Sequence, residues 1–423
     1  MEPKQLLLGS FHAAVAAADP LRVLPQHLPA PPAGRTLVVG AGKAAASMAL
    51  AVERHWPVDA PLEGLVITRY RHGLPTNRIK VIEAGHPVPD ETGEAAAKEI
   101  LRRVGSLEPS DLLLALVSGG GSALLSLPEE GVGMDALKTT TKELLRSGAP
   151  IQEMNTVRKH LSAIQGGWLA AACKAPVLAL IISDVTGDDP THIASGPCAP
   201  DPTTYSDALR VLDRYNVDPV TAVRNHLERG VRGEVPETPK PGDRIFFHVE
   251  NRVVATASQA LRAAQDFFHE HQVSTMILGD SVTGEAAEVA KAHGALARQI
   301  ARHAEPAKLP VALISGGECT VTVRGSGRGG RCTEFLLSLA LDLAGLPKTH
   351  AIACDTDGID GSEDNAGAVL SPDTLTRSAR LGLDATRLLA NNDSYGFFSK
   401  LDQLVVTGPT RTNVNDYRAI LVA

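Results

Sequence analysis

The stretch LLLALVSGGGSALL, residues 112–125, decides the fold. Its first six residues form a short, continuous aliphatic run, which is typical of a strand buried on both faces of a parallel sheet. The strand then ends in a loop made of Ser118, Gly119, Gly120, Gly121 and Ser122. Glycine lets the backbone take positive φ and approach a ligand closely, so successive N–H groups can face an anion. We therefore expect an anion-binding loop here, with a simple strand-to-helix turn as the alternative.

A second strand with the same kind of ending occurs at residues 311–318, VALISGGE. Its loop consists of Ser315, Gly316, Gly317 and Glu318. Because this loop ends on a carboxylate, it is suited to a cation or a hydroxyl group and not to an anion. The two loops together predict a binding cleft, although each is also compatible with a tight turn.

The composition is that of an ordinary globular enzyme. The 423 residues predict two to three domains, and 43% hydrophobic with 21% charged residues allows a substantial core. The formal net charge is −7 and the basic residues are scattered, which argues against nucleic-acid binding. The five cysteines show no CxxC spacing, so we expect reduced thiols in a cytoplasmic protein. No apolar run is long enough for a membrane span, and the alanine-rich N-terminal stretch is predicted to be a surface helix.

Strands alternate with helices along the first half of the chain. The expected strands cover residues 36–40, 65–68, 80–85, 112–117 and 177–185. This alternation predicts an α/β fold with a doubly wound, Rossmann-like N-terminal domain. Ligands of such sheets bind at the carboxyl ends of the strands, where most of the unusual loops of this chain fall.

The segment EVPETPKPGD, residues 234–243, is rich in proline and charge and serves as the predicted domain boundary. We therefore expect an N-terminal domain over residues 1–238 and a second α/β domain over residues 239–423. The expected strands of the second domain cover residues 252–257, 275–280, 310–317, 350–358 and 404–408. The last strand is compatible with either domain.

The loop GAGKAA, residues 40–45, follows the first strand and opens a helix. Gly40 and Gly42 fit a variant of the dinucleotide-binding pattern G-x-G-x-x-A, so a nicotinamide cofactor has to be considered. The second strand ends without an acidic residue and is followed by Arg69 and Arg71, which would leave NADP as the candidate. Lys43 opposes the dipole of the helix that it precedes, which an anionic ligand would explain; a solvated surface lysine is the alternative.

Acidic residues gather after two of the predicted strands. Asp184 follows one strand, and Asp355 and Asp357 end another. Magnesium in phosphoryl-transfer sites is held by one or two carboxylates together with phosphate oxygens, so Asp184, Glu318 and Asp355 are candidate metal ligands. Asx-turns and helix caps are the alternative for such aspartates.

Arginines surround a glycine-dense turn at residues 324–334, where Arg331 stands next to a helix start. Arginine suits the binding of a carboxylate or of a transferring phosphoryl group. Arg158 lies beside a lysine and a histidine and adds capacity for anions, unless it belongs to a solvated helix face.

The chain resembles the glycerate 2-kinase family, the type with a C-terminal MOFRL domain that has often been labelled hydroxypyruvate reductase. The matching blocks run in order from the first strand almost to the C-terminus. They are GAGKAAASMA (40–49), AGHPVPDE (84–91), VSGGGSALL (117–125), MNTVRKHLSAIQGG (154–167), ISDVTGDDPTHIASGP (182–197), SGGECTVTV (315–323), GRGGRCTEFLL (327–337), DTDGIDG (355–361) and GPTRTNVND (408–416).

The resemblance implies transfer of the γ-phosphoryl group of ATP, with Mg²⁺, to the 2-hydroxyl of D-glycerate. It also implies a Rossmann-like N-terminal domain and a smaller α/β C-terminal domain, with the active site in the cleft between them. It places the catalytic residues of the family on Lys43, Asp184 and Arg331. The residues expected to bind substrate or nucleotide are Gly40, Gly42, Ser118, Gly119, Gly120, Gly121, Ser122, Arg158, Ser315, Gly316, Gly317, Glu318, Asp357 and Asn413. The chain departs from the family pattern at Gln165, Cys332, Thr333 and Arg411, and these departures bear on the preference for nucleotide or substrate.

Two other functions compete with the kinase. An NADPH-dependent hydroxypyruvate reductase would use the GAGKAA loop, and a non-catalytic protein would only bind a sugar acid or a nucleotide. The partners expected from these readings are small molecules, without nucleic acid or membrane, and a homodimer is one candidate assembly.

Overall fold

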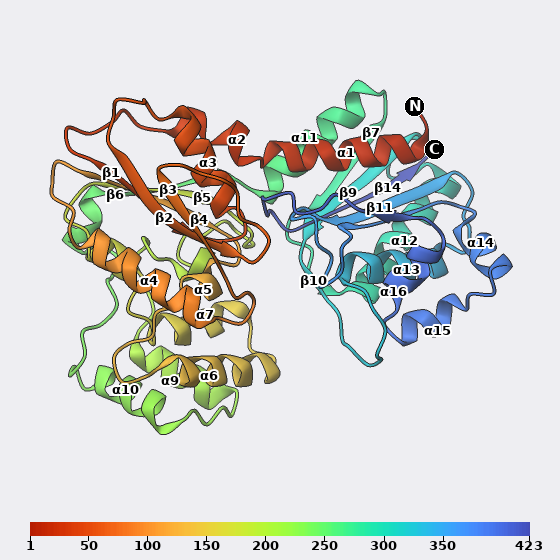
Figure 1. Cartoon of the computed structure of the whole chain (residues 1–423). Coiled ribbons are helices and arrows are strands. Elements are labelled where there is room, and N and C mark those ends of the chain that lie inside the picture. The colour runs from red at the N-terminus through yellow and green to blue at the C-terminus, as the bar shows by residue number, and fades with distance from the viewer. The chain divides into compact units, whose positions relative to one another are not determined.

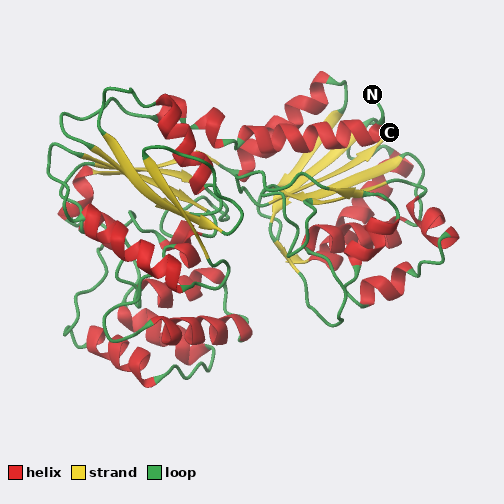
Figure 2. Cartoon of the chain, viewed as in Figure 1, coloured by secondary structure: helices red, strands yellow, loops and turns green.

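The protein consists of two compact units. The computed structural model describes all residues from Met1 to Ala423. We call Pro20–Val254 the N-terminal unit, and Met1–Asp19 together with Ala255–Ala423 the C-terminal unit. Each unit contains one large sheet with helices packed against it (Figure 2). No helix is both long enough and apolar enough to cross a membrane.

The N-terminal unit begins with short elements and continues as alternating strands and helices. Its strands are β1 (Thr36–Ala41), β2 (Leu62–Arg69), β3 (Ile79–Ala84), β4 (Leu112–Ser118), β5 (Val177–Ile182) and β6 (Val249–Ala255). Its helices are α2 (Pro20–Val23), α3 (Ala45–His55), α4 (Glu91–Val104), α5 (Gly121–Leu124), α6 (Met134–Arg146), α7 (Ile151–Lys159), α8 (Trp168–Ala171), α9 (Tyr205–Arg214) and α10 (Thr221–Val231), with 3₁₀ turns η1 (Pro25–His27), η2 (Ile193–Ser195) and η3 (Arg244–His248).

The C-terminal unit contains the remaining elements. Its strands are β7 (Ser274–Gly279), β8 (Gly284–Glu285), β9 (Val311–Gly317), β10 (Cys319–Thr320), β11 (Thr349–Asp355), β12 (Gly367–Leu370), β13 (Leu404–Val405) and β14 (Asp416–Val422). Its helices are α1 (Pro3–Ala17), α11 (Ala257–Glu270), α12 (Ala286–His303), α13 (Arg331–Leu343), α14 (Thr374–Arg380), α15 (Ala385–Ala390) and α16 (Ser394–Lys400).

The sheet of the N-terminal unit has the strand order β3-β2-β1-β4-β5-β6. The five neighbouring strands β3, β2, β1, β4 and β5 are all parallel. Every residue of β1, β4 and β5 is buried, as their aliphatic runs predict for strands covered on both faces. The direction of winding reverses between β1 and β4. Ligands of doubly wound sheets bind at such a reversal, beyond the carboxyl ends of the strands.

The predicted domain boundary at residues 238/239 is wrong. The charged segment 234–243 packs on the N-terminal unit, where Glu237 Oε1 lies 3.0 Å from His160 Nε2 and Thr238 donates a 3.1 Å hydrogen bond to Asp201. Asp201 also forms a fully buried salt bridge of 2.8 Å with Lys159. The segment therefore has polar partners in the interior, which its composition does not reveal. The strand expected at residues 252–257 is part of β6 and belongs to the first sheet.

The sheet of the C-terminal unit is mixed. Its order is β13-β12-β11-β14-β9-β7, in which β7 and β9 are parallel and the other pairs are antiparallel. The strand expected at residues 404–408 is the short edge strand β13, and the last strand, β14, lies between β9 and β11. The suggestion that the last strand might pack on the N-terminal domain is therefore wrong. Sequence reasoning missed β12 and β14.

The N-terminal helix α1 belongs to the C-terminal unit, which also departs from the predicted division. Gly9 of α1 faces Phe267 of α11 so closely that an added Cβ would lie 2.2 Å from the ring. The Tyr417 hydroxyl donates a 2.8 Å hydrogen bond to Ser10. In Figure 1, α1 and α11 lie side by side over one face of the sheet, while α12 and α13 cover the other.

The glycine-dense segment at residues 324–330 is anchored to the α15–α16 connection. Asn392 Oδ1 accepts hydrogen bonds from the N–H groups of Arg324 (2.7 Å) and Gly325 (3.0 Å). The Nδ2 atom of Asn392 donates 3.1 Å to Glu334 in the first turn of α13. Burial raises the pKa of Glu334 to about 7. The side-chain amide of Asn392 thus links the glycine-dense segment to the first turn of α13.

The buried pair of Lys159 and Asp201 predicts a large stability effect. The substitution Asp201→Asn removes the charge that balances the buried ammonium group of Lys159. We therefore expect the free energy of unfolding to fall by about 3 kcal/mol. Urea unfolding can be followed by the fluorescence of Trp56 and Trp168, which both lie in this unit. The control is Asp218→Asn, whose carboxylate is 93% exposed. Equal unfolding curves for the two variants would contradict the prediction.

The raised pKa of Glu334 predicts a pH-dependent effect. A carboxyl group whose pKa is higher in the folded state favours the fold below its unfolded value, and this contribution is lost as the pH rises through about 7. Glu334→Gln should therefore match the wild type near pH 4.5 and become more stable by up to about 3 kcal/mol at pH 8. Thermal unfolding by circular dichroism between these pH values measures the difference. Glu288→Gln, an exposed residue of α12, is the control, and a pH-independent difference for Glu334→Gln would refute the prediction.

Candidate active site

The β1–α3 turn and the β4–α5 loop of the N-terminal unit interlock at the reversal of the sheet. The Lys43 N–H donates a 2.8 Å hydrogen bond to the carbonyl of Gly119, and the Ala44 N–H donates 3.1 Å to Ser118 Oγ. At Gly42, with φ of 142°, an added Cβ would lie 2.1 Å from Ser118 Oγ. Glycine is required here because the second loop occupies the space of a side chain.

The two loops differ in the hydrogen bonds that their N–H groups make. The N–H groups of residues 42–45 all donate to acceptors within the protein. Those of residues 119–122 donate no hydrogen bond within the protein. The β4–α5 loop therefore has backbone donors available for an anion, whereas the GAGKAA turn does not. We call residues 118–122 the cradle.

Lys43 and His86 flank the cradle at Gly120. A Cβ added to Gly120, whose φ is 81°, would lie 2.9 Å from His86 Nε2 and 3.4 Å from Lys43 Cγ. Both side chains can carry positive charge, so the electrostatic potential at the cradle favours an anion. Spacing along the chain did not indicate that His86 lies beside Lys43 at Gly120.

Asp184 lies at the same edge of the sheet as Lys43. In the β4–β5 register Ser118 is paired with Ile182, and half-buried Asp184 follows two residues later. The nearby Asp189 accepts a 2.9 Å hydrogen bond from the N–H of Thr191, which is the local turn expected for an aspartate in such a loop. Asp184 is therefore the acidic group that the strand ends bring to the edge with the cradle.

Arg158 is a further basic group of the N-terminal unit. Its Nη1 donates a 3.2 Å hydrogen bond to Asn155 Oδ1, and its guanidinium forms no salt bridge. Burial lowers the pKa of Arg158 to about 10. A guanidinium that loses hydration without gaining a carboxylate partner is well suited to binding an anionic ligand.

Two further residues hold the cradle in place. Gln165 Nε2 donates 2.9 Å hydrogen bonds to the carbonyls of Ser122 and Leu125, so this departure from the family pattern acts on the backbone of the loop. Gly40 lies within β1, and a Cβ there would come within 2.0 Å of the carbonyl of Leu116. Gly40 therefore serves strand packing, and direct contact with a ligand is not needed to explain it.

In the C-terminal unit Arg331 gathers three carboxylates. Its Nε donates 2.8 Å to Asp416, its Nη2 donates 2.7 Å to Asp355, and its Nη1 lies 3.1 Å from Glu318. Burial by itself lowers the pKa of Arg331, but the three carboxylates outweigh this effect and raise it well above the usual value. Glu318 is the most exposed of the three, with 54% of its side chain accessible.

Sequence reasoning missed Asp416 and Arg418, which connect Arg331 to the second glycine loop. Asp416 accepts a 2.7 Å hydrogen bond from Arg418, whose side chain is 1% exposed. Arg418 in turn donates 3.1 Å and 3.4 Å to the carbonyls of Gly316 and Gly317. This loop therefore presents carbonyls to a cation. The apolar run at residues 419–423 was the signal that would have revealed β14.

The other predicted residues of this unit make local contacts. Ser315 Oγ lies 3.1 Å from His293 Nε2. Asp357 Oδ1 accepts a 2.8 Å hydrogen bond from the N–H two residues later, and Asn413 does the same at 3.3 Å. These bonds fix the loops after β11 and before β14, which carry Asp357 and Asn413 at the same end of the sheet as Asp355 and Asp416.

Two departures from the family pattern face the interior. The N–H groups of Cys332 and Thr333 donate 2.9 Å hydrogen bonds to the Asp360 carboxylate, which caps α13. The Thr333 hydroxyl adds a 2.7 Å bond to the same carboxylate. Burial raises the pKa of Asp360. Cys332 and Thr333 therefore act on the helix that carries Arg331.

No group of three or more histidine, cysteine, aspartate or glutamate side chains is arranged to hold a metal ion. Of the candidate metal ligands, Glu318 and Asp355 both contact Arg331. Asp184 lies in the other unit. The structure thus brings two of the three carboxylates together, around an arginine.

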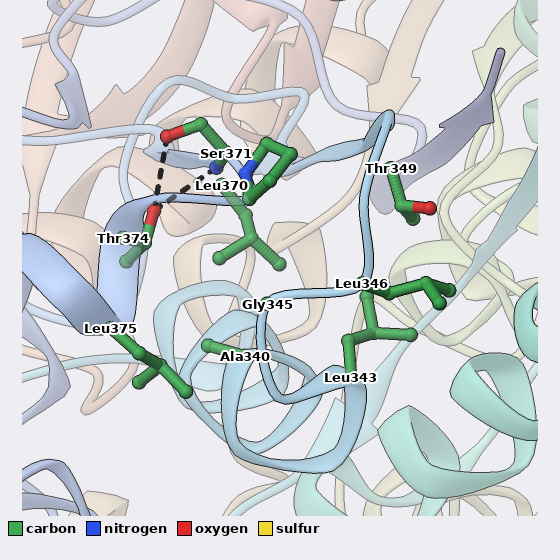
Figure 3. Close-up of a pocket in the computed structure, with 10 residues that line it drawn as sticks. Ala340, Leu343, Gly345, Leu346, Thr349, Leu370, Ser371, Thr374 and Leu375 are labelled. Carbon is green, nitrogen blue, oxygen red and sulfur yellow. Dashed lines mark hydrogen bonds between the residues drawn. The ribbon is translucent and has the colours of Figure 1, made fainter.

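A separate pocket in the C-terminal unit is too small for a substrate. It lies between the end of α13 and the β12–α14 turn, where Leu343, Leu370 and Leu375 line it (Figure 3). Its volume of about 10 Å³ is close to that of one water site. None of the predicted site residues contributes to it.

Two family models match the chain. The domain of unknown function DUF4147 matches residues 6–228, and the MOFRL family matches residues 311–416. The first match covers more than half of the chain and includes the cradle, Lys43 and Asp184. The second includes Glu318, Arg331 and Asp355.

Relatives match over nearly the whole length. A protein of Agrobacterium vitis that carries the provisional name hydroxypyruvate reductase is 49% identical, with 99% of this chain and 94% of the relative covered. A glycerate 2-kinase of Pyrococcus horikoshii is 39% identical over 98% of this chain and 96% of the relative. The crystal structure of a glycerate kinase from Thermotoga maritima matches with a TM-score of 0.88 at 36% identity and covers 99% of both chains. The chain therefore belongs to the glycerate 2-kinase family, with a DUF4147 region followed by a MOFRL region.

Proposed function

We propose that this protein transfers the γ-phosphoryl group of ATP to the 2-hydroxyl of D-glycerate and releases 2-phosphoglycerate and ADP. The observation that carries the proposal is the full-length similarity to a glycerate 2-kinase, with the MOFRL region included. The N-terminal unit supports it with an anion cradle, two basic groups and an aspartate at one edge of a parallel sheet. Phosphoryl transfer needs positioning and charge neutralisation more than covalent chemistry, and these groups supply both.

In this proposal the cradle and Lys43 hold negatively charged groups of the reactants. The N–H groups of residues 119–122 are directed to no internal acceptor, so they can bind phosphate or carboxylate oxygens. The side chain of Lys43 lies beside Gly120 and would neutralise negative charge that develops on the phosphoryl group during its transfer. Arg158 would bind the carboxylate of the hydroxy acid, because its guanidinium has no carboxylate partner of its own.

Asp184 and Arg331 complete the proposed catalytic set. Asp184 would accept the proton of the attacking hydroxyl or help to position magnesium. Arg331 would have to exchange one of its carboxylates for the transferring phosphoryl group. Glu318 is the partner best placed for this exchange, since it is the most exposed of the three.

We propose that ATP is the phosphoryl donor and that Mg²⁺ binds together with it. Magnesium in such sites needs only one or two carboxylates in addition to phosphate oxygens, and Asp184, Glu318 and Asp355 are the residues that would supply them. Bound magnesium would neutralise the phosphate charge. The five cysteines are free and buried, which supports a reducing compartment such as the cytoplasm.

We further propose that the N-terminal unit is Rossmann-like and that both units contribute to one active site. The strand order and the reversal between β1 and β4 support the first point. The second rests on the division of the proposed catalytic residues, because Lys43 and Asp184 belong to one unit and Arg331 to the other. A homodimer stays a prediction.

A hydroxypyruvate reductase is the second candidate, and the name of the Agrobacterium vitis relative favours it. A nicotinamide dinucleotide would need the backbone donors of the GAGKAA turn for its pyrophosphate. The N–H groups of residues 42–45 are already bonded within the protein, and Gly42 leaves no space beside Ser118. These contacts support the kinase over the reductase.

The proposed reaction is tested by a coupled assay. The protein is mixed with D-glycerate, ATP and Mg²⁺, with enolase as the only enzyme that acts on the phosphoglycerate product. We expect ADP release together with phosphoenolpyruvate, because enolase uses the 2-phosphate. ADP without phosphoenolpyruvate would place the phosphoryl group on another hydroxyl or acceptor. No ADP, together with oxidation of NADPH by hydroxypyruvate, would replace the kinase with the reductase.

Variants of the basic residues test the proposed catalytic set. Lys43→Ala should lower kcat by at least about 100-fold, as expected for a group that stabilises transition-state charge, without a change in Tm. Arg331→Lys keeps a cation among the three carboxylates but loses the planar fork, so kcat should fall while the fold persists. Lys291→Ala, an exposed lysine paired with Glu288, is the control. A wild-type kcat in either variant would remove that residue from the mechanism.

A further inference from the structure

A chain of hydrogen bonds links Arg158 to the cradle through two buried side chains. Arg158 Nη1 lies 3.2 Å from Asn155 Oδ1, and Ser195 Oγ lies 3.3 Å from the same oxygen. Ser195 Oγ is also 2.9 Å from Ser122 Oγ in the cradle. Asn155 is 2% exposed and Ser195 is fully buried, so neither can exchange these partners for water.

The guanidinium of Arg158 determines which atom donates and which accepts in each of these hydrogen bonds. A guanidinium only donates, so the atom of Asn155 that faces Arg158 must be the amide oxygen. That oxygen only accepts, so Ser195 must give it its single hydroxyl proton. The hydroxyl of Ser195 then has only lone pairs left for Ser122, and Ser122 must donate its own proton to Ser195.

Ser122 is therefore left as a hydrogen-bond acceptor at the cradle. Its one proton points inward to Ser195, and its lone pairs are available to a ligand. Its backbone is fixed as well, because its carbonyl accepts hydrogen bonds from Gln165 (2.9 Å) and Ser126 (3.1 Å). Ser122 is half-buried, so a ligand can reach it. An oxygen that can only accept selects a donor such as a hydroxyl group, whereas the N–H groups of the same loop select anions.

The backbone that carries Ser195 is unusual. Ala194, Ser195 and Gly196 follow one another with φ values of 51°, 59° and 61°. The left-handed conformation costs a residue with a side chain roughly 1–2 kcal/mol. A Cβ added to Gly121 of the cradle would lie 2.5 Å from Ala194 Cβ, so this strained turn packs directly against the cradle. Strain that is maintained next to a binding loop is typical of a positioning element.

We propose that Ser122, oriented by Ser195 and Asn155, accepts a hydrogen bond from the 3-hydroxyl of the hydroxy acid whose carboxylate binds Arg158. The inference rests on the proposed kinase function and adds to it the residues that select the substrate. The 2-hydroxyl is not the partner of Ser122, because a reacting hydroxyl must lose its proton to a base, and a serine that has no base beside it is a poor one. Ser195 and Asn155 are positioning residues in this account.

The test compares D-glycerate with D-lactate, which has the same configuration and lacks only the 3-hydroxyl. The wild type should prefer D-glycerate in kcat/KM by at least about tenfold, since a site that bonds a substrate hydroxyl discriminates against its absence. In Ser122→Ala and Ser195→Ala the preference should fall to about two- to threefold. The kcat/KM for D-glycerate should fall by a larger factor than the kcat/KM for D-lactate.

Two further variants separate positioning from folding. Ser195→Gly removes the hydroxyl and suits the left-handed backbone, so it should lose the preference like Ser195→Ala while its Tm stays at or above that of the wild type. Ser147→Ala, which removes a hydroxyl that bonds only to the carbonyl of Leu144 at the end of α6, should keep the preference. An unchanged preference in both Ser195 variants, or an equal loss for both acids, would overturn the inference.

Failure of the kinase proposal would be visible separately. If the wild type releases no ADP with either acid, the proposed reaction falls. Calorimetry then still tests the role of Ser122, because it measures the binding of each acid in the absence of nucleotide. Tighter binding of D-glycerate by the wild type, lost in Ser122→Ala, would support the inference. Equal binding of both acids, or no binding of either, would refute it.

Discussion

The close approach of two loops at the reversal of the parallel sheet is the constraint on which the N-terminal unit depends. Gly42 leaves room for Ser118, and Gly121 leaves room for Ala194. A Cβ at Gly42 would lie 2.1 Å from Ser118 Oγ and one at Gly121 would lie 2.5 Å from Ala194 Cβ, so a side chain at either position would clash. Because the β1–α3 turn bonds to the β4–α5 loop, its own N–H groups are engaged and those of the cradle are not. The packing of glycine thus decides which of two similar loops can receive an anion.

The two units differ in how they balance charge. In the N-terminal unit Arg158 is desolvated beside a neutral amide, and its lowered pKa reflects burial that no carboxylate offsets. In the C-terminal unit Arg331 is surrounded by carboxylates that raise its pKa. In the proposed mechanism the first arrangement would bind the carboxylate of the substrate. In the second, Arg331 would exchange its exposed ion pair with Glu318 for the transferring phosphoryl group.

The sequence predicted the parallel sheet and the glycine loop after β4 because both have local signals. Continuous aliphatic runs marked β1, β4 and β5, and the glycines after β4 marked the loop. The domain division was wrong because residues 234–243 look like a linker, although Glu237 and Thr238 bond into the interior. The partners of Arg331 on β14 and the relay from Asn155 through Ser195 to Ser122 were missed. Such contacts join residues up to 85 positions apart, and no pattern along the chain records them.

The central claim is that the reaction phosphorylates the 2-hydroxyl of a hydroxy acid. Phosphorus NMR of the product formed from ATP and D-glycerate tests it most directly, because the coupling pattern reports the number of protons on the phosphorylated carbon. A 2-phosphate is attached to a carbon with one proton, so the account predicts a new phosphomonoester signal that is a doublet. A triplet, which indicates the CH₂ group of a 3-phosphate, or the absence of any new signal would contradict the account.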